Sequence, residues 1–155
     1  MDLIIERLYV GEAREARGFS GRVLCVLNSW AWDGAEDAVW LPVVKADYDN
    51  LERPIEALQQ NLDLAADVID GWLRDGADVL VNCREGRERG PLTIAWFLHR
   101  KRGMPLDDAY YLLKSKRPSV VDRRLWLPPI MRAHESLRLP ASRGGMITKV
   151  IDADG

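Results

Sequence analysis

The sequence is poor in the residues that bind metal ions or cross-link small domains. It contains only two cysteines, Cys25 and Cys83, and two histidines, His99 and His134. This set is too small for the usual structural zinc site, which takes four cysteine or histidine ligands. The two cysteines could form one disulfide, but nothing else in the chain resembles a disulfide-linked secreted scaffold, so we predict reduced thiols and a cytoplasmic protein.

Long hydrophobic runs and an excess of one charge are also lacking. The apolar stretches fall far short of the ~20 residues that a membrane-spanning helix needs, and the N-terminus has no apolar run followed by a small-residue cleavage site. Twenty-two basic residues against 24 acidic ones give a net charge of -2. This balance argues against nucleic-acid binding through bulk positive charge. We therefore expect neither a membrane nor a nucleic acid as a partner.

What the chain does have is the size and composition of one globular domain. It has 155 residues, of which 47% are hydrophobic and 30% charged, as in ordinary folded domains. The residues from Pro140 onward include Gly144 and Gly145 and few candidates for a core. We predict a folded domain over residues 1–139 and a C-terminal tail over residues 140–155.

Apolar runs without alternation are typical of strands that are covered on both faces. Such runs occupy residues 8–10, 22–27, 39–44 and 78–81, and Pro42 indicates an edge or a bulge in the third. Apolar spacing of three and four residues predicts helices. They cover the stretch between Pro54 and Gly76 and residues 91–102, 106–116 and 122–137. The predicted fold class is α/β, with a central, mostly parallel sheet of four or five strands and helices on both faces.

The segment from Val79 to Ile94, with the sequence VLVNCREGRERGPLTI, is the part that carries chemistry. A buried strand leads to Cys83, a glycine-containing loop follows, and Arg89 precedes a helix. The N–H groups of a tight loop and the positive end of a helix dipole favour an anion. A thiolate is favoured at such a place, and an arginine there can bind two phosphate oxygens. We predict that Cys83 is a nucleophile and that the phosphate-binding residues are Arg84, Glu85, Gly86, Arg87, Glu88 and Arg89.

These residues form a C-x5-R signature that resembles the dual-specificity phosphatases of the protein-tyrosine-phosphatase superfamily. The resemblance covers residues 5–137. It includes ERLYVG near the N-terminus, the strand from Val23 to Asn28, LPVV with the aspartates after it, and KRPSV at 116–120. It implies a cysteine-dependent phosphomonoester phosphatase that needs no metal or cofactor. The implied substrate is a phosphorylated protein, carrying phosphotyrosine, phosphoserine or phosphothreonine.

The resemblance also implies a two-step reaction. The Cys83 thiolate attacks phosphorus and forms a phosphocysteine, while an aspartic acid protonates the leaving group and then activates a water molecule. Asp47 and Asp49, which precede Cys83 by 36 and 34 residues, lie where the family carries this acid. We favour Asp47, because it is nearer to the end of the predicted strand. The other aspartate is then expected to cap a helix starting near Leu51.

Two positions depart from the family pattern. The family usually has histidine before the cysteine and serine or threonine after the arginine, whereas this chain has Asn82 and Gly90. Asn82 lacks the positive character of a histidine. Gly90 lacks a hydroxyl that in relatives donates to the cysteine sulfur as it leaves. We therefore expect hydrolysis of the phosphocysteine to be slow, so that the intermediate accumulates.

Three other interpretations are open. The departures fit a catalytically weak phosphate-binding module, a pseudophosphatase. Arg84 and Arg87 fit a more acidic substrate, such as a phosphoinositide or an RNA 5'-triphosphate, although Glu85 and Glu88 offset their charge. A rhodanese-like sulfurtransferase also uses a loop cysteine, but the upstream aspartates fit it less well. Cys25, in the middle of a predicted strand, is expected to lie in the core and to have no chemical role.

Overall fold

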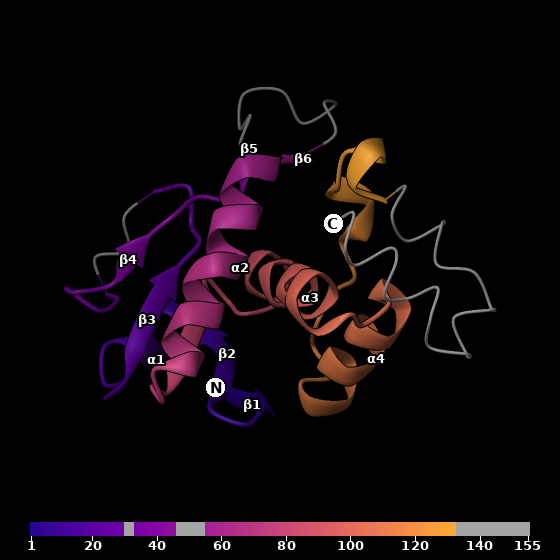
Figure 1. Ribbon diagram of the computed structural model, residues 1–155. Helices are drawn as coiled ribbons and strands as arrows, with labels where there is room; N and C mark the ends of the chain where they lie inside the picture. Colours follow the sequence, from indigo (N-terminus) through magenta and orange to yellow (C-terminus); the bar gives the residue numbers. More distant parts are fainter. Residues whose placement is uncertain (30–32, 46–54, 133–155) are drawn as a thin grey trace.

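A five-stranded sheet forms the centre of the structure, a computed structural model that describes residues 1–29, 33–45 and 55–132 (Figure 1). Its strands are β1 (Asp2–Ile5), β2 (Leu8–Glu12), β3 (Arg22–Cys25), β4 (Val39–Trp40) and β7 (Val79–Cys83). They lie in the order β1-β2-β7-β3-β4. All neighbouring pairs are parallel except β1 and β2, which are antiparallel at one edge. The predicted α/β class with a mostly parallel sheet is confirmed.

Helices lie on both faces of the sheet but are unequally divided. On one face are α2 (Gln59–Arg74), α3 (Arg89–Arg102) and α4 (Leu106–Lys116), with α3 between the other two (Figure 1). On the opposite face lies the short helix α1 (Ala13–Ala16). Its Ala16 packs in a small buried cluster with Val23 and Leu80. None of the described helices is long and apolar enough to span a membrane.

The central helix α3 is buried almost along its length, as its apolar composition predicts. Every residue from Gly90 to His99 is buried. The helix begins at Arg89, two residues before its predicted start, and ends at Arg102, followed by Gly103, whose φ of 67° provides a left-handed C-cap. Helix α4 has the predicted bounds, 106–116. Because α3 packs against α2, α4 and β7, the residues at its N-terminus are held at the end of β7.

The helix predicted from Pro54 starts later than expected. Residues Glu56–Ala57 form β6, which pairs antiparallel with β5 (Val44–Lys45), and α2 begins only after Leu58, its N-cap. Ile55 is 39% exposed and does not belong to the buried stripe. The pairing with β5 uses backbone groups that a helix would need, which explains the shift. The aspartates expected to cap a helix near Leu51 lie outside the described residues.

Two further predicted elements are broken where prolines interrupt them. The run 39–44 is split at Pro42 into β4, on the edge of the large sheet, and β5, in a separate two-stranded sheet. The helix predicted over 122–137 is instead a 3-10 turn, η1 (Arg124–Trp126), followed by helical residues 129–132. Pro128 lies between the two pieces and Pro129 begins the second, because proline lacks the N–H that the interior of a continuous helix requires but is tolerated in a first turn. Residues 133–155, with the predicted tail, lie outside the described part.

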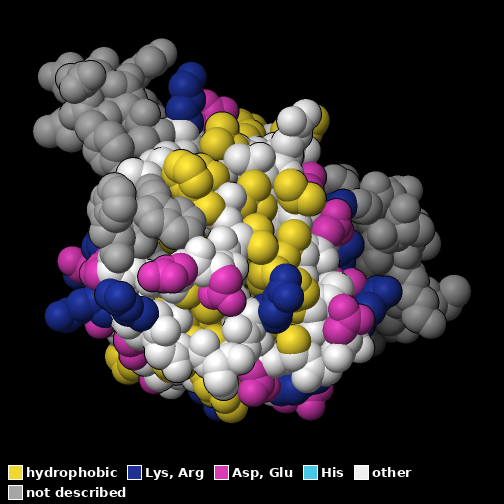
Figure 2. All heavy atoms as spheres, turned by 90° about the vertical axis from the view of Figure 1, so that its left-hand side faces the viewer, with side chains coloured by type: hydrophobic (Ala, Val, Ile, Leu, Met, Phe, Trp, Pro, Cys, Tyr) yellow, Lys and Arg dark blue, Asp and Glu magenta, His cyan; other side chains and the backbone are white. Residues whose placement is uncertain are grey.

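The short strand β4 is one edge of the sheet, opposite β1. Figure 2 looks onto this side, where hydrophobic side chains lie between charged ones. Val39 and Trp40 are 37% and 45% exposed, and the indole N–H of Trp40 donates to the carbonyl of Leu27 at 2.6 Å. A strand of two residues offers few unpaired backbone groups to another chain.

Candidate active site

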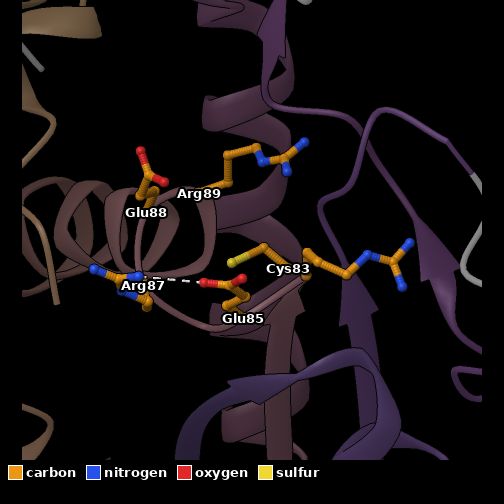
Figure 3. A pocket seen from close by; sticks show the side chains of 6 residues that line it. Cys83, Glu85, Arg87, Glu88 and Arg89 are labelled. Atoms are coloured by element: carbon orange, nitrogen blue, oxygen red, sulfur yellow. Dashed lines mark hydrogen bonds and ion pairs between the residues drawn. The ribbon is translucent and has the colours of Figure 1, made fainter. Parts of the chain in front are cut away.

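The predicted chemistry-bearing residues meet at the carboxyl end of β7, where parallel sheets place their ligands. Cys83 is the last residue of this strand and Arg89 the first of α3. A pocket of about 210 Å³ is lined by Cys83, Arg84, Glu85, Arg87, Glu88 and Arg89 (Figure 3). The sulfur of Cys83 points towards the middle of this group. Asp47 and Asp49 lie outside the described residues.

The backbone of the loop turns its carbonyl groups away from the pocket. The carbonyl oxygens of Arg84, Glu85, Gly86, Arg87 and Glu88 accept hydrogen bonds from Ala13, Arg117 (twice), Val121 and Leu92, respectively. In a trans peptide unit the carbonyl and the next N–H point in opposite directions, and no cis peptide occurs in the described chain. The N–H groups of residues 85–89 therefore point inward, an arrangement suited to a tetrahedral anion.

Arg117 fixes the turn of the loop. Its Nε donates to the carbonyl of Gly86 and its Nη2 to that of Glu85, both at 2.9 Å, while Nη1 pairs with Asp2 at 2.8 Å. Gly86 has a φ of 69°, and a Cβ there would lie 2.8 Å from the carbonyl carbon of Gly11, so only glycine fits. Arg117 belongs to the KRPSV segment, for which the sequence predicted no role. No spacing rule indicates that it reaches the loop.

Replacing Arg117 with lysine should lower kcat/KM for para-nitrophenyl phosphate about tenfold. A lysine presents one compact charge, so it cannot hold two carbonyls and a carboxylate at once, and the loop loses its fixed geometry. Arg7→Lys is the control, because Arg7 also donates to a backbone carbonyl, that of Leu73 at 3.0 Å, but lies before β2 at the far end of the sheet. Equal losses of activity in the two variants would contradict the assigned role.

Charged side chains around the pocket are paired, and Arg89 contacts a neutral amide instead. The pairs are Arg84 with Asp33 at 3.2 Å, Arg87 with Glu85 at 3.3 Å, and Arg123 with Glu88 at 2.8 Å. Arg89 donates from Nη1 to the amide oxygen of Asn28 at 2.9 Å. The exposed pairs contribute little to stability. Their effect is to offset the charges of Arg84 and Arg87, while no carboxylate offsets Arg89 among its described contacts.

Asn82, which stands where the family usually has histidine, is buried under the site. Its side-chain nitrogen approaches the carbonyl oxygen of Cys83 at 3.4 Å and the sulfur of Cys25 at 3.7 Å. Cys25 is 3% exposed in β3, and burial raises the pKa of its thiol. The prediction that Cys25 is a core residue is confirmed.

Gly90 lies directly beside the sulfur of Cys83. A Cβ at this position would be 3.5 Å from the Cys83 sulfur and 3.2 Å from the Cγ2 methyl of Val10. The first hydroxyl of α3, that of Thr93, donates to the carbonyl of Arg89 at 2.8 Å. A side chain at position 90 would point at the Cys83 sulfur. The serine or threonine hydroxyl that this chain lacks would therefore lie beside the sulfur.

Replacing Gly90 with serine should speed hydrolysis of the phosphocysteine and raise the steady-state rate roughly tenfold, the worth of one hydrogen bond to a charged sulfur. The methyl of Val10 must shift by a few tenths of an ångström to admit the new side chain. Stopped-flow kinetics with para-nitrophenyl phosphate separate the two steps, and the first-turnover burst should shrink. Gly90→Ala adds the same Cβ without the hydroxyl. A gain of equal size in the alanine variant would refute this explanation.

The sequence and the fold both match known proteins. Residues 28–133 match the family described as dual specificity phosphatase, catalytic domain. Dual specificity phosphatase 28 of Mus musculus is 31% identical over 116 residues, which cover 72% of this chain and 69% of that protein. Dual specificity protein phosphatase 1 of Arabidopsis thaliana is 30% identical over 123 residues, covering 75% of this chain and 60% of that protein.

Solved structures extend the match to the fold. A mouse putative dual specificity phosphatase complexed with zinc tungstate superposes with a TM-score of 0.66 and 25% identity, covering 94% of this chain and 90% of that chain. Human DUSP28 superposes with a TM-score of 0.65 and 24% identity, covering 81% of this chain and 86% of that chain. The sheet order and the position of the loop after β7 thus belong to a known architecture.

Proposed function

This chain belongs to the dual specificity phosphatase family and is a cysteine-based phosphatase, and we propose that Cys83 is its nucleophile and Arg89 its phosphate-binding arginine. One observation carries this assignment: the Cys83 sulfur lies in a pocket that Arg89 also lines and towards which the N–H groups of residues 85–89 point. The family implies phosphorylated proteins as substrates in general.

The proposed reaction passes through two displacements at phosphorus. The Cys83 thiolate forms the S–P bond as the P–O bond to the leaving group breaks, and Asp47 gives that oxygen a proton. Water then attacks phosphorus, the S–P bond breaks, and the same carboxylate takes the proton from the water. Asp49 is the alternative acid. Arg89 and the loop N–H groups stabilise the charge on the equatorial oxygens in both steps.

We propose phosphotyrosine in proteins, with phosphoserine and phosphothreonine, as the substrate in preference to polyanions. The support is the pairing of charge at the pocket: Arg84 and Arg87 are each offset by a carboxylate. A phosphoinositide or an RNA 5'-triphosphate carries several additional negative charges, which such a rim attracts weakly. A single phosphate monoester needs only Arg89 and the loop.

The test of this function is para-nitrophenyl phosphate turnover with the first turnover resolved, followed by acid quenching and mass spectrometry. A burst of one nitrophenolate per protein with a phosphoryl group on Cys83 is the expected result. Failure to release nitrophenolate while tungstate still binds would instead indicate the phosphate-binding module. A higher kcat/KM for a phosphoinositide or a triphosphorylated RNA than for a phosphotyrosyl peptide would overturn the substrate assignment.

We also propose that the protein works in the cytoplasm. A thiolate nucleophile is active only while it is reduced, and the cytoplasm keeps thiols reduced. Both cysteines of the chain are free. Cell fractionation with an antibody to the protein tests the location.

A further inference from the structure

Asn28 connects the phosphate-binding arginine to a neighbouring backbone segment. It follows β3 at the carboxyl end of the strands. There the backbone N–H of Val26 extends the pairing with β7 by donating to the backbone carbonyl of Asn82 at 2.9 Å. Its side-chain oxygen accepts from Nη1 of Arg89 at 2.9 Å, and its side-chain nitrogen donates to the carbonyl of Val44 at 2.6 Å. A carboxamide supplies both an acceptor and a donor, so one side chain makes both contacts.

The contact with Asn28 uses one part of the Arg89 guanidinium. An arginine carries five N–H groups in a planar fork. With Nη1 directed to Asn28, the edge formed by Nε and Nη2 has no hydrogen bond to another described residue, and its geometry suits two phosphate oxygens. Figure 3 shows the guanidinium turned away from Glu85, Arg87 and Glu88, so these charges do not set its orientation.

A fixed partner matters because a free arginine side chain has many rotamers. Ordering it when phosphate binds costs conformational entropy. A neutral amide reduces this cost without neutralising the guanidinium, whereas a carboxylate partner would offset the charge that must act on phosphate. Val44, in β5, gives the amide a second anchor and prevents it from rotating away.

We propose that Asn28 is a positioning residue that orients Arg89 for phosphate binding by joining it to the backbone of Val44. The inference rests on the proposed function and adds to it a residue that does not touch the substrate. Asn61 provides a matched comparison, because its side-chain nitrogen also donates to a backbone carbonyl of the same segment, that of Pro42 at 2.6 Å. This hydrogen bond joins Asn61 to Pro42 and does not involve the loop.

The test is a double-mutant cycle read by tungstate binding in a calorimeter. Asn28→Ala should weaken tungstate binding about tenfold, in line with the loss of a hydrogen bond to a charged group. Arg89→Ala should weaken it further, and adding Asn28→Ala to that variant should change nothing, because Asn28 acts through Arg89. Asn61→Ala should leave the affinity within about twofold of wild type. Asn28→Ser, which also lacks the carboxamide, replaces Asn28→Ala should the alanine variant fail to fold, and the same loss is expected. Thermal unfolding verifies that each protein is folded.

The outcomes separate this inference from the proposed function. Additive losses in the cycle, or equal losses from Asn28→Ala and Asn61→Ala, would overturn the role of Asn28. If the wild-type protein binds tungstate but does not hydrolyse para-nitrophenyl phosphate, the proposed function fails and the cycle still decides about Asn28. A wild-type protein that binds neither tungstate nor inorganic phosphate contradicts both.

Discussion

Replacing Cys83 with serine should lower the turnover of para-nitrophenyl phosphate by at least about 1,000-fold, since the reaction loses its nucleophile. A serine hydroxyl remains protonated at neutral pH, and no described side chain of the pocket lining is a histidine that would activate it. The loop N–H groups and Arg89 are unchanged in this variant. Tungstate binding should therefore survive within about tenfold, because it depends on those groups.

The matched control for this experiment is Cys25→Ser. It makes the same chemical change at the other cysteine, which lies in β3 and is 3% exposed. The buried hydroxyl should lower the free energy of unfolding by about 1–2 kcal/mol while kcat stays within about threefold of wild type. Should Cys83→Ser retain a tenth of the wild-type turnover, or Cys25→Ser lose it all, the assignment of the nucleophile is wrong.

Replacing Arg89 with lysine should lower kcat/KM by roughly 100- to 1,000-fold, the usual cost of removing one charge-stabilising donor from a transition state. Lysine keeps the charge but cannot bind two equatorial oxygens side by side, and it cannot donate to Asn28 and phosphate through one planar group. Both kcat and KM should suffer, because the arginine binds the phosphate in the ground state and in the transition state. The measurement is the full dependence of rate on substrate concentration.

Arg74→Lys controls for a general effect of exchanging arginine for lysine. Arg74 is 77% exposed at the end of α2 and pairs with Asp70 at 2.9 Å. Its replacement should alter kcat/KM by less than about twofold, in keeping with the small worth of an exposed ion pair. Were Arg89→Lys to behave like Arg74→Lys, Arg89 would not be the phosphate-binding arginine.

Local sequence patterns predicted the elements correctly where the conformation of a segment depends on its own residues. The apolar run before Cys83, the glycine in the loop and the apolar stretch after Pro91 predict a strand, a turn and a buried helix, and β7 and α3 are found there. The bounds of α4 follow from its spacing and from Gly103 before it. Such features depend on propensity and periodicity within a dozen residues.

Predictions failed where a long-range pairing competed with a local preference. The stretch from Ile55 has helical spacing, yet Glu56–Ala57 pair with Val44–Lys45, a segment more than ten residues earlier. That pairing yields its hydrogen bonds only after distant residues have met, and local spacing carries no record of it. Strand β1 was not predicted either, although its pairing with β2 is local, across a turn at Arg7 with a φ of 62°.

The residues alone predicted an α/β domain, and they predicted Cys83 and Arg89 at the two ends of a loop suited to an anion. The contacts that hold this loop in shape are evident only from the packing of elements far apart in the sequence. Arg117 lies 31 residues from the Gly86 carbonyl it binds, and Asn28 lies 61 residues from Arg89. The physical reason is that helices and strands arise from neighbouring residues, whereas the orientation of a catalytic side chain depends on how whole elements pack against one another.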